Sequence, residues 1–403
     1  MSLPLSGLRI VVRASGVAAA YAARLLSTMG AEAILAEPAQ GSPLRREPPF
    51  LPSPSGEGPG VGAVGKMQPL PATCPTPTPP LKGRGSQVSA LFAYLAAGMR
   101  SAVAEGDALN ALLSEADIFI DDTPLAQREA LGLDEASIAA RHPDLIHVSV
   151  LPFGAHGAKA HWKGEDITVL HASGEGYLLP NGLTCELFPD RPPVKVYGHF
   201  ASLQGGIAAA LGALSALWVR PGLGGQYVDI SSQDASLAVG AFAIQRLGDG
   251  QVEHRAERSF RYGGVIPCAD GYVELLTLEQ RQWHGLVELL GRPGWALAPE
   301  LEDSLERSRQ GPMINARIRE WASTRKVEDI VREGQKLSVP LAKYYTPAEV
   351  VRDPHEKVRG LFQPVDTGAG VFAMLVSPFQ FDGAALSLNS GPPELGEYAR
   401  VVP

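Results

Sequence analysis

Residues 8–37 read LRIVVRASGVAAAYAARLLSTMGAEAILAE and decide the class of fold. The apolar run at 8–12 predicts a buried strand, and the alanine-rich stretch 18–29 predicts a helix. Gly30 is placed as the residue that ends this helix, and the chain returns as a strand over 31–37. A strand, a helix and a second strand in this order begin a doubly wound α/β domain with a parallel sheet.

The same segment lacks the glycines of a dinucleotide-binding loop. That loop needs three glycines so that the backbone can approach a pyrophosphate. After Gly16 the chain continues with Val17 and three alanines. The sequence therefore argues against an NAD enzyme.

Further alternation of helix and strand extends the pattern toward the C-terminus. The predicted elements are helices at 108–115 and 134–141 and strands at 116–120 and 145–151. Parallel sheets bind ligands beyond the carboxyl ends of their strands. Residues 121–123 and 152–154 follow two such ends, so we expect ligand contacts there.

The second half of the chain predicts a smaller α+β domain. A hairpin with Asp270-Gly271 at its turn belongs to it. The apolar run 207–219 is too short to span a bilayer and predicts a buried helix. Other predicted elements are helices at 165–179, 205–219 and 233–247 and a strand at 226–230. The predicted domains are a large one over 1–225, a small one over 226–345, and a return to the large domain over 346–403.

Residues 51–86 differ in composition from the rest of the chain. Proline and glycine supply nearly half of this segment. Proline lacks a backbone N–H and glycine is costly to order, so neither helix nor sheet is favoured. We interpret the segment as a tolerated loop insertion, and a proline-rich ligand for a recognition domain is the alternative.

The amino-acid composition indicates a globular protein and argues against several kinds of partner. The chain has 403 residues, of which 45% are hydrophobic and 19% charged, and its net charge is -8. These values are typical of a globular protein and argue against nucleic acid as the main partner. The three cysteines and nine histidines match no metal-ligand spacing, and the cysteines are expected to be free thiols. With no secretory signal and no basic membrane-facing stretch, we expect a cytoplasmic protein without a membrane partner.

The chain resembles the family III CoA-transferases, a family that also includes acyl-CoA racemases and CoA-dependent isomerases. The resemblance covers nearly the whole chain outside 51–86 and rests on the order and spacing of several segments. These include PLSGLRIV at 4–11, ADIFI at 116–120, HPDLIHVSVLPFG at 142–154, GGQYVDISSQDA at 224–235 and VPLAKYYTPAEVVRDPH at 339–355. The resemblance implies a Rossmann-like large domain that binds coenzyme A, a smaller domain, and an interlocked dimer.

The family's nucleophile position carries a different residue here. In the family, an aspartate attacks the acyl-CoA thioester, forms a mixed anhydride, and then carries CoA as an enzyme thioester. The matching position follows Gly198 and is His199. An imidazole cannot form that carboxylic anhydride, but it could act as a base. The alternative is a drifted, non-catalytic position.

Two carboxylates stand where the racemases have their catalytic histidine. Those enzymes pair a histidine with the aspartate for proton transfer at the substrate Cα. Here the stretch reads GEDI at 164–167, so Asp166 matches a common family carboxylate and Glu165 replaces the histidine. The alternative is that both only complement a helix start. If Glu165, Asp166 and His199 converge, they would suit proton transfer better than acyl transfer.

The positions that the resemblance assigns to coenzyme A have lost cations. Leu35 replaces a basic residue two positions before Glu37, and no cation follows the strand that ends before Asp121. Phosphates need cations or bare N–H groups, so we expect weak affinity for CoA. Gly263-Gly264 match the family's mobile active-site loop, although a hairpin turn explains them equally well. The candidate cofactor-binding residues are Arg100, Arg45, Glu37, Asp121, Gly263 and Gly264.

The first functional hypothesis is a divergent family III CoA-transferase that acts on acyl-CoA thioesters and carboxylic acids. One alternative is an acyl-CoA racemase or isomerase that works by proton transfer. The other is a non-catalytic subunit that pairs with an active family member. The expected assembly is a homodimer or a heterodimer with a related subunit.

Overall fold

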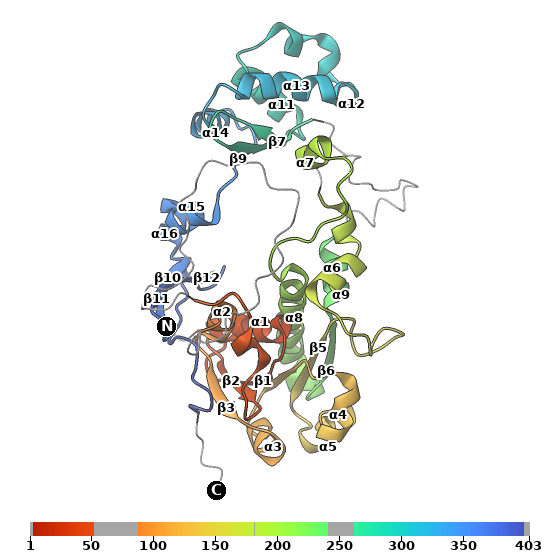
Figure 1. The fold of residues 1–403 in the computed structure, drawn as a ribbon, viewed down its shortest axis with the longest axis vertical. Helices are drawn as coiled ribbons and strands as arrows, with labels where there is room; N and C mark the ends of the chain where they lie inside the picture. The colour runs from red at the N-terminus through yellow and green to blue at the C-terminus, as the bar shows by residue number, and fades with distance from the viewer. Residues whose placement is uncertain (1–2, 52–87, 181, 241–261, 399–403) are drawn as a thin grey trace, which may run out of the picture. The chain divides into compact units, whose positions relative to one another are not determined.

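The structure is a computed structural model that describes residues 3–51, 88–180, 182–240 and 262–398. The chain divides into two compact units. Unit 1 comprises Met1–Ser173, Val196–Val239 and Asp353–Pro403, and unit 2 comprises Gly174–Lys195 and Gly240–Arg352. Figure 1 labels the helices and strands of both units.

Unit 1 is built on a parallel sheet with the strand order β3-β2-β1-β4-β5-β6. Its strands are β1 (Arg9–Arg13), β2 (Glu32–Glu37), β3 (Arg100–Val103), β4 (Ile118–Asp121), β5 (Ile146–Leu151) and β6 (Tyr227–Ser231). The predicted α/β fold class is confirmed. The strand order reverses between β1 and β4, and such a reversal is where doubly wound sheets open a crevice for ligands.

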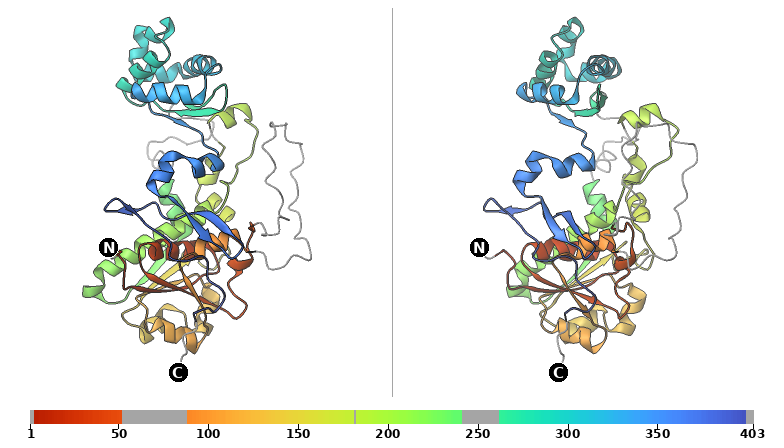
Figure 2. Two further views of the ribbon diagram at one scale, coloured as in Figure 1. Left: turned by 90° about the vertical axis from the view of Figure 1, so that its left-hand side faces the viewer. Right: turned by 60° about the vertical axis from the view of Figure 1, so that its left-hand side comes forward.

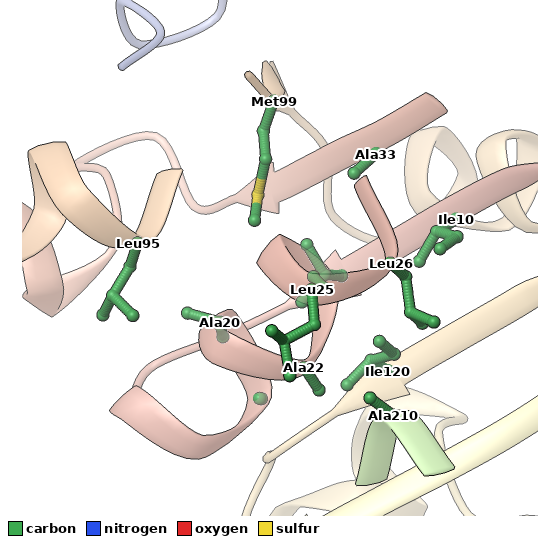
Figure 3. Close-up of a cluster of buried hydrophobic side chains, with 14 of the residues drawn as sticks. Ile10, Ala20, Ala22, Leu25, Leu26, Ala33, Leu95, Met99, Ile120 and Ala210 are labelled. Carbon is green, nitrogen blue, oxygen red and sulfur yellow. The ribbon is translucent and has the colours of Figure 1, made fainter. Parts of the chain in front are cut away.

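Helices cover both faces of this sheet (Figure 1). One face carries α1 (Val17–Thr28), α2 (Ala90–Ala96) and α8 (Phe200–Leu223), whose apolar side chains join those of β1 and β4 in a common core. Figure 3 shows Leu25 and Leu26 of α1 in this core with Ile10, Ile120 and Ala210. The other face carries α3 (Asp107–Leu113), α4 (Leu125–Leu131) and α5 (Glu135–Arg141).

Helix α8 is longer than predicted, because the more polar residues on both sides of 205–219 are helical too. Its alanines form the buried face, whereas Leu211 and Trp218 are 65% and 86% exposed. By length and hydropathy alone α8 would also pass for a membrane-spanning helix. The predicted buried helix is therefore buried on its alanine face and exposed on the face that carries Leu211 and Trp218.

The predicted helix at 165–179 is interrupted. Helix α6 covers Asp166–Ala172, and a 3-10 turn covers Glu175–Leu178. Gly174 lies between them with φ +83°. This left-handed backbone conformation cannot continue an α-helix, and glycine adopts it without strain.

The C-terminal part of unit 1 returns to the core of the large sheet. Its elements are α16 (Pro354–Arg359), β10 (Phe362–Asp366), β11 (Val371–Leu375), β12 (Gln380–Phe381) and β13 (Ala384–Ala385). Val365, Met374 and Leu388 are buried in the same core as α1. Figure 2 shows these strands in blue on the α1 side of the sheet.

Unit 2 has an antiparallel sheet of three strands among helices. The strands are β7 (Gly264–Pro267), β8 (Tyr272–Leu275) and β9 (Leu341–Lys343). The hairpin at Asp270-Gly271 joins β7 to β8, as predicted. Trp283, Ile314 and Ile318 are buried at the centre of the unit. Among the described residues of this unit, the α-helices are α7 (Gly182–Leu187), α11 (Gln280–Leu289), α12 (Ser304–Arg309), α13 (Gly311–Ala322), α14 (Val327–Lys336) and α15 (Pro347–Arg352), with 3-10 turns at Gly294–Leu297 and Pro299–Glu302.

The boundaries between the units differ from the predicted ones at 226 and 346. Strand β6 and helix α9 (Ser232–Val239) belong to unit 1, because β6 pairs with β5 and completes the parallel sheet. Residues 174–195 belong to unit 2, and the return to unit 1 starts at Asp353. The predicted insertion at 51–86, apart from Leu51, and residues 241–247 of the predicted helix lie outside the described residues.

Candidate functional site

The crevice that the strand order leads us to expect between β1 and β4 would lie where the α1 helix begins. β1 ends at Arg13, and Ser15 and Gly16 lead into α1. The Asp122 carboxylate, just after β4, accepts hydrogen bonds from the backbone N–H of Ser15 at 2.8 Å and of Gly16 at 2.6 Å. Burial raises the pKa of Asp122 to about 7, and these two hydrogen bonds oppose that rise. The Asp122 side chain thus accepts hydrogen bonds from backbone N–H groups at the start of α1. In dinucleotide-binding folds, the equivalent N–H groups bind a phosphate.

Glu37 and Arg45 bind each other beyond the end of β2. Nε and one terminal nitrogen of Arg45 donate to the two carboxylate oxygens of Glu37, each at 2.7 Å. Glu37 is fully buried and also accepts from the Ser101 hydroxyl and the Ser42 N–H. Burial alone would raise the pKa of Glu37, but these donors hold it below its usual value. Both residues were predicted to bind the cofactor, but in the structure they bind each other in an internal ion pair.

Arg100 lies at the other edge of the sheet. It is the first residue of β3, and its guanidinium contacts Glu32, the first residue of β2, at 3.1 Å. The guanidinium also lies 5.2 Å from the centre of the Tyr398 ring. Arg45 follows the carboxyl end of β2, so the structure does not bring these two candidate phosphate ligands together.

Asp121 belongs to a buried polar cluster under α4. One of its oxygens lies 3.4 Å from Nε of Arg128 and 3.7 Å from Nε2 of His147. Arg128 also donates to the Tyr227 hydroxyl at 3.2 Å. Asp121, Arg128 and His147 are each at most 3% exposed. Asp121 therefore contacts buried groups of the protein itself, Arg128 and His147, whereas its neighbour Asp122 contacts the start of α1.

The predicted catalytic residues lie at the starts of two helices that a hydrogen bond joins, Glu165 and Asp166 at the start of α6 and His199 at the start of α8. His199 is the residue that precedes α8, and it is half-buried. Asp166, the first residue of α6, accepts a hydrogen bond from the Ser202 N–H in the first turn of α8 at 2.9 Å. Glu165 precedes α6, and its N–H donates to the Thr168 hydroxyl at 2.7 Å. The starts of α6 and α8 are therefore joined through Asp166.

The two carboxylates at this point have different surroundings. Oδ1 of Asp166 is held by Ser202, and its Oδ2 is shielded from solvent, so Asp166 is suited to hold the helix. Glu165 is exposed. A helix start carries partial positive charge, which stabilises an anion formed beside it. An imidazole and an exposed carboxylate at such a place can do acid–base or nucleophilic chemistry on a carbonyl group.

Gly263 and Gly264 lie in unit 2 at the start of β7. Both have positive φ, +87° and +76°. The Gly263 N–H donates to Oδ1 of Asn315 at 2.7 Å, and a Cβ on Gly263 would lie 2.6 Å from the carbonyl oxygen of Leu275. Strand pairing in the hairpin thus accounts for glycine at 263.

Arg13 is a residue whose placement the sequence analysis missed. Arg13 ends β1 at the crevice and donates from Nε to the Thr123 hydroxyl at 3.2 Å. A charged residue directly after the apolar run of β1 is the signal that could have found it. Among the described residues, no three His, Cys, Asp or Glu side chains gather in a way that could hold a metal ion.

Comparison with known proteins gives consistent matches. The sequence profile of CoA-transferase family III matches residues 82–398. The chain is 27% identical over 415 residues to the succinate–glutarate CoA-transferase of Agrobacterium fabrum, covering 98% of this chain and 94% of that one. It is 24% identical over 416 residues to the BbsE subunit of succinyl-CoA:(R)-benzylsuccinate CoA-transferase from Thauera aromatica, covering 97% and 92%.

Two further matches concern a longer protein and a solved structure. The chain is 28% identical over 390 residues to the "Probable CoA-transferase Rv1866" of Mycobacterium tuberculosis, covering 93% of this chain but only 44% of that protein. The crystal structure of a CAIB/BAIF family protein from Brucella suis superposes with a TM-score of 0.77 at 26% identity, covering 98% and 97%. Since the family profile spans most of the sequence and the fold agrees, the chain belongs to CoA-transferase family III.

Proposed function

We propose that this chain transfers CoA between an acyl-CoA thioester and a carboxylic acid, with Glu165 as the carboxylate that forms the covalent intermediates. The observation that carries the proposal is the junction of α6 and α8. The Asp166–Ser202 hydrogen bond joins the helix start that carries Glu165 and Asp166 to the helix start that follows His199, and of the two carboxylates only Glu165 is exposed. The relatives named as CoA-transferases over nearly the whole chain support the reaction class.

The chemistry needs one carboxylate and no outside reagent. The Glu165 carboxylate attacks the thioester carbonyl, the C–S bond breaks, and CoA leaves as a thiolate from a mixed anhydride. The thiolate attacks the Glu165 carbonyl, which releases the first acid and leaves CoA as a thioester on Glu165. The carboxylate of the second acid attacks this thioester, expels the CoA thiolate and forms a second mixed anhydride with Glu165. The thiolate then attacks the acyl carbonyl of that anhydride, which gives the new acyl-CoA and releases the Glu165 carboxylate. His199 stands beside these steps as a base and hydrogen-bond donor, not as the carrier of CoA.

A second candidate function is proton transfer at the Cα of an acyl-CoA. The observation that favours it is the pairing of an imidazole with a carboxylate at one helix start. His199 would remove the α-proton and Glu165 would return one to the opposite face of the enolate. In this reaction no covalent bond forms between enzyme and acyl group.

A third candidate function is that of a subunit. Helix α8 exposes Ile207, Leu211 and Trp218, which lie on one side of the helix at spacings of four and seven residues. An apolar stripe of this kind is suited to a second copy of the chain or to a related subunit. The BbsE relative is itself named a subunit, which supports the same idea. A partner that carries the family's aspartate would then supply the nucleophile.

The test uses the purified chain with succinyl-CoA as donor and glutarate as acceptor. Under the first proposal, Glu165→Gln should lower the transfer rate at least 100-fold, whereas Glu135→Gln, on the exposed start of α5, should leave it unchanged. Borohydride treatment after succinyl-CoA should modify residue 165. Transfer that survives Glu165→Gln would refute the covalent role of Glu165.

The same preparation separates the other two candidates. Proton transfer predicts exchange of the substrate α-hydrogen with deuterated water, and this exchange should be absent in His199→Ala. A subunit role predicts activity only when a related chain is co-expressed, unaffected by either variant. Replacing His199 by Asp should create or raise transfer activity if the family's own route still fits this site.

A further inference from the structure

We propose that Lys159 is a specificity-determining residue that binds the second carboxylate of a dicarboxylic acid. The ligand class is a short aliphatic dicarboxylic acid, taken up as the acid that accepts CoA. The inference rests on the proposed function, because it names the acid that would be joined to CoA at Glu165. The loop 152–164 carries it through a half-buried ammonium, two aromatic rings beside that ammonium, and a close contact directly before Glu165.

The loop 152–164 runs from β5 to α6, and its two ends touch (Figure 1). A Cβ on Gly164 would lie 2.6 Å from Cβ of Pro152 and 3.0 Å from Cε2 of Phe153. Glycine at 164 is what allows this approach, because a larger residue would push the ends apart. The Phe153 ring therefore lies against the backbone that leads directly into Glu165.

Lys159 holds its ammonium beside two aromatic rings of the same loop. Nζ lies 5.7 Å from the centre of the Phe153 ring and 5.7 Å from the centre of the Trp162 ring. The two rings lie 6.0 Å apart at an angle of 80°. Nζ also lies 3.5 Å from Oε1 of Gln233 in the first turn of α9. Since aromatic faces attract an ammonium group, these contacts keep Nζ at a defined place.

The contacts of Lys159 within the described residues include no carboxylate. Its polar contact there is the neutral amide of Gln233. The carboxylate of Asp229, which belongs to the neighbouring strand β6, accepts a hydrogen bond from the Ala155 N–H at 2.7 Å instead. A half-buried cation is stabilised when an anion pairs with it, and the carboxylate of a ligand supplies that anion here.

The spacing suits an acid that has a short apolar chain between two carboxylates. One aromatic ring, that of Phe153, separates the Lys159 ammonium from the backbone before Glu165. The methylene groups of the acid would lie against this ring, with one carboxylate at Lys159 and the other toward Glu165. Trp162 is 59% exposed and offers a second apolar surface to the chain. A monocarboxylic acid of the same length lacks one of the two charges, so it should bind more weakly.

Three variants separate the charge of Lys159 from its packing. Lys159→Met removes the charge but keeps an unbranched side chain that can lie beside the rings. Lys159→Arg keeps the charge and should keep the preference for a dicarboxylic acid. Lys163→Met is the matched control, because Lys163 is an exposed lysine of the same loop without a ring contact or an ion pair among the described residues.

The experiment is an NMR titration of the full chain, observed on the ligand, with glutarate and with valerate, which has the same number of carbons but one carboxylate. We expect the wild type to bind glutarate at least tenfold more tightly than valerate, as one charge-assisted hydrogen bond allows. In Lys159→Met this preference should fall below about twofold, whereas Lys159→Arg and Lys163→Met should keep it. The proposal is overturned if the wild type binds neither acid or shows no preference, or if Lys159→Met retains the preference.

A salt series on the wild type provides the test if Lys159→Met does not fold. The preference for glutarate over valerate should fall at least threefold between about 20 and about 500 mM sodium chloride, because salt screens the additional charge pair. A preference that does not change with salt would contradict the role of Lys159. All of these readouts are affinities for free acids. A chain that binds glutarate through Lys159 but does not transfer CoA would therefore refute the proposed function and not this inference.

Discussion

Helix α8 packs closely against α1 at Gly206, where a single added methyl group should destabilise unit 1. A Cβ on Gly206 would lie 2.7 Å from the carbonyl oxygen of Ala18 and 3.1 Å from Cβ of Tyr21. Real Cβ atoms essentially never approach another atom to less than 3.0 Å. The carbonyl oxygen is part of the α1 backbone and cannot rotate away, so one helix has to shift.

Two opposing terms set the size of the effect of Gly206→Ala. Alanine favours a helix interior over glycine by about 1 kcal/mol. Overpacking a closely packed core costs about 1–3 kcal/mol. We expect a net loss in the free energy of unfolding of about 1 kcal/mol. Gly222→Ala near the end of the same helix has nothing within 4 Å of the new Cβ, so it should be neutral or stabilising by up to about 1 kcal/mol.

The assay is urea unfolding followed by far-ultraviolet circular dichroism, with the wild type and both variants side by side. The unfolding midpoint of Gly206→Ala should fall and that of Gly222→Ala should stay or rise, with unchanged slopes. A Gly206→Ala protein as stable as Gly222→Ala would refute the reasoning, because the contact with Ala18 would then impose no cost. If Gly206→Ala loses CoA transfer as well as unfolding at lower urea concentration, the contact between α1 and α8 also positions the residues at the start of α8.

Three other predictions concern the buried ion pair of Glu37 with Arg45 and the apolar stripe of α8. Arg45→Ala leaves Glu37 buried without its guanidinium and should lower the free energy of unfolding by about 3–5 kcal/mol, measured by urea unfolding at pH 7. The folded-state pKa of Glu37 is below its usual value, so the stabilisation from its ionised form is present at neutral pH and is lost as the pH falls. Glu37→Gln should therefore make the free energy of unfolding less dependent on pH on the acid side. An unchanged dependence on pH would contradict this. Leu211→Glu should convert a dimer to monomers in analytical ultracentrifugation, whereas an unaltered sedimentation coefficient would show that the α8 stripe is not an interface.

The sequence was enough to predict the parallel sheet and the residues at the start of α8. Apolar runs with a strand or helix period are local signals, and they located β1, α1 and β2 within a few residues. A family resemblance that covers nearly the whole chain outside 51–86 identified residues 165–166 and 199 as candidates. The extent of α8 was underestimated, because its flanking turns carry polar and charged residues that hydropathy alone does not assign to a helix.

Only the tertiary structure determines which charged side chains are bound to other groups of the protein. Glu37 and Arg45 were both candidates for ligand contacts, yet they lie close enough to form an ion pair, and the burial of Glu37 makes the loss of its partner costly. Asp122 reaches Ser15 and Gly16 across more than a hundred residues because β1 and β4 are neighbours in the sheet. The sequence gives the residue types, but strand order and register determine which donor lies next to which acceptor. The free energy of such contacts depends on that distance and burial, which exist only after folding.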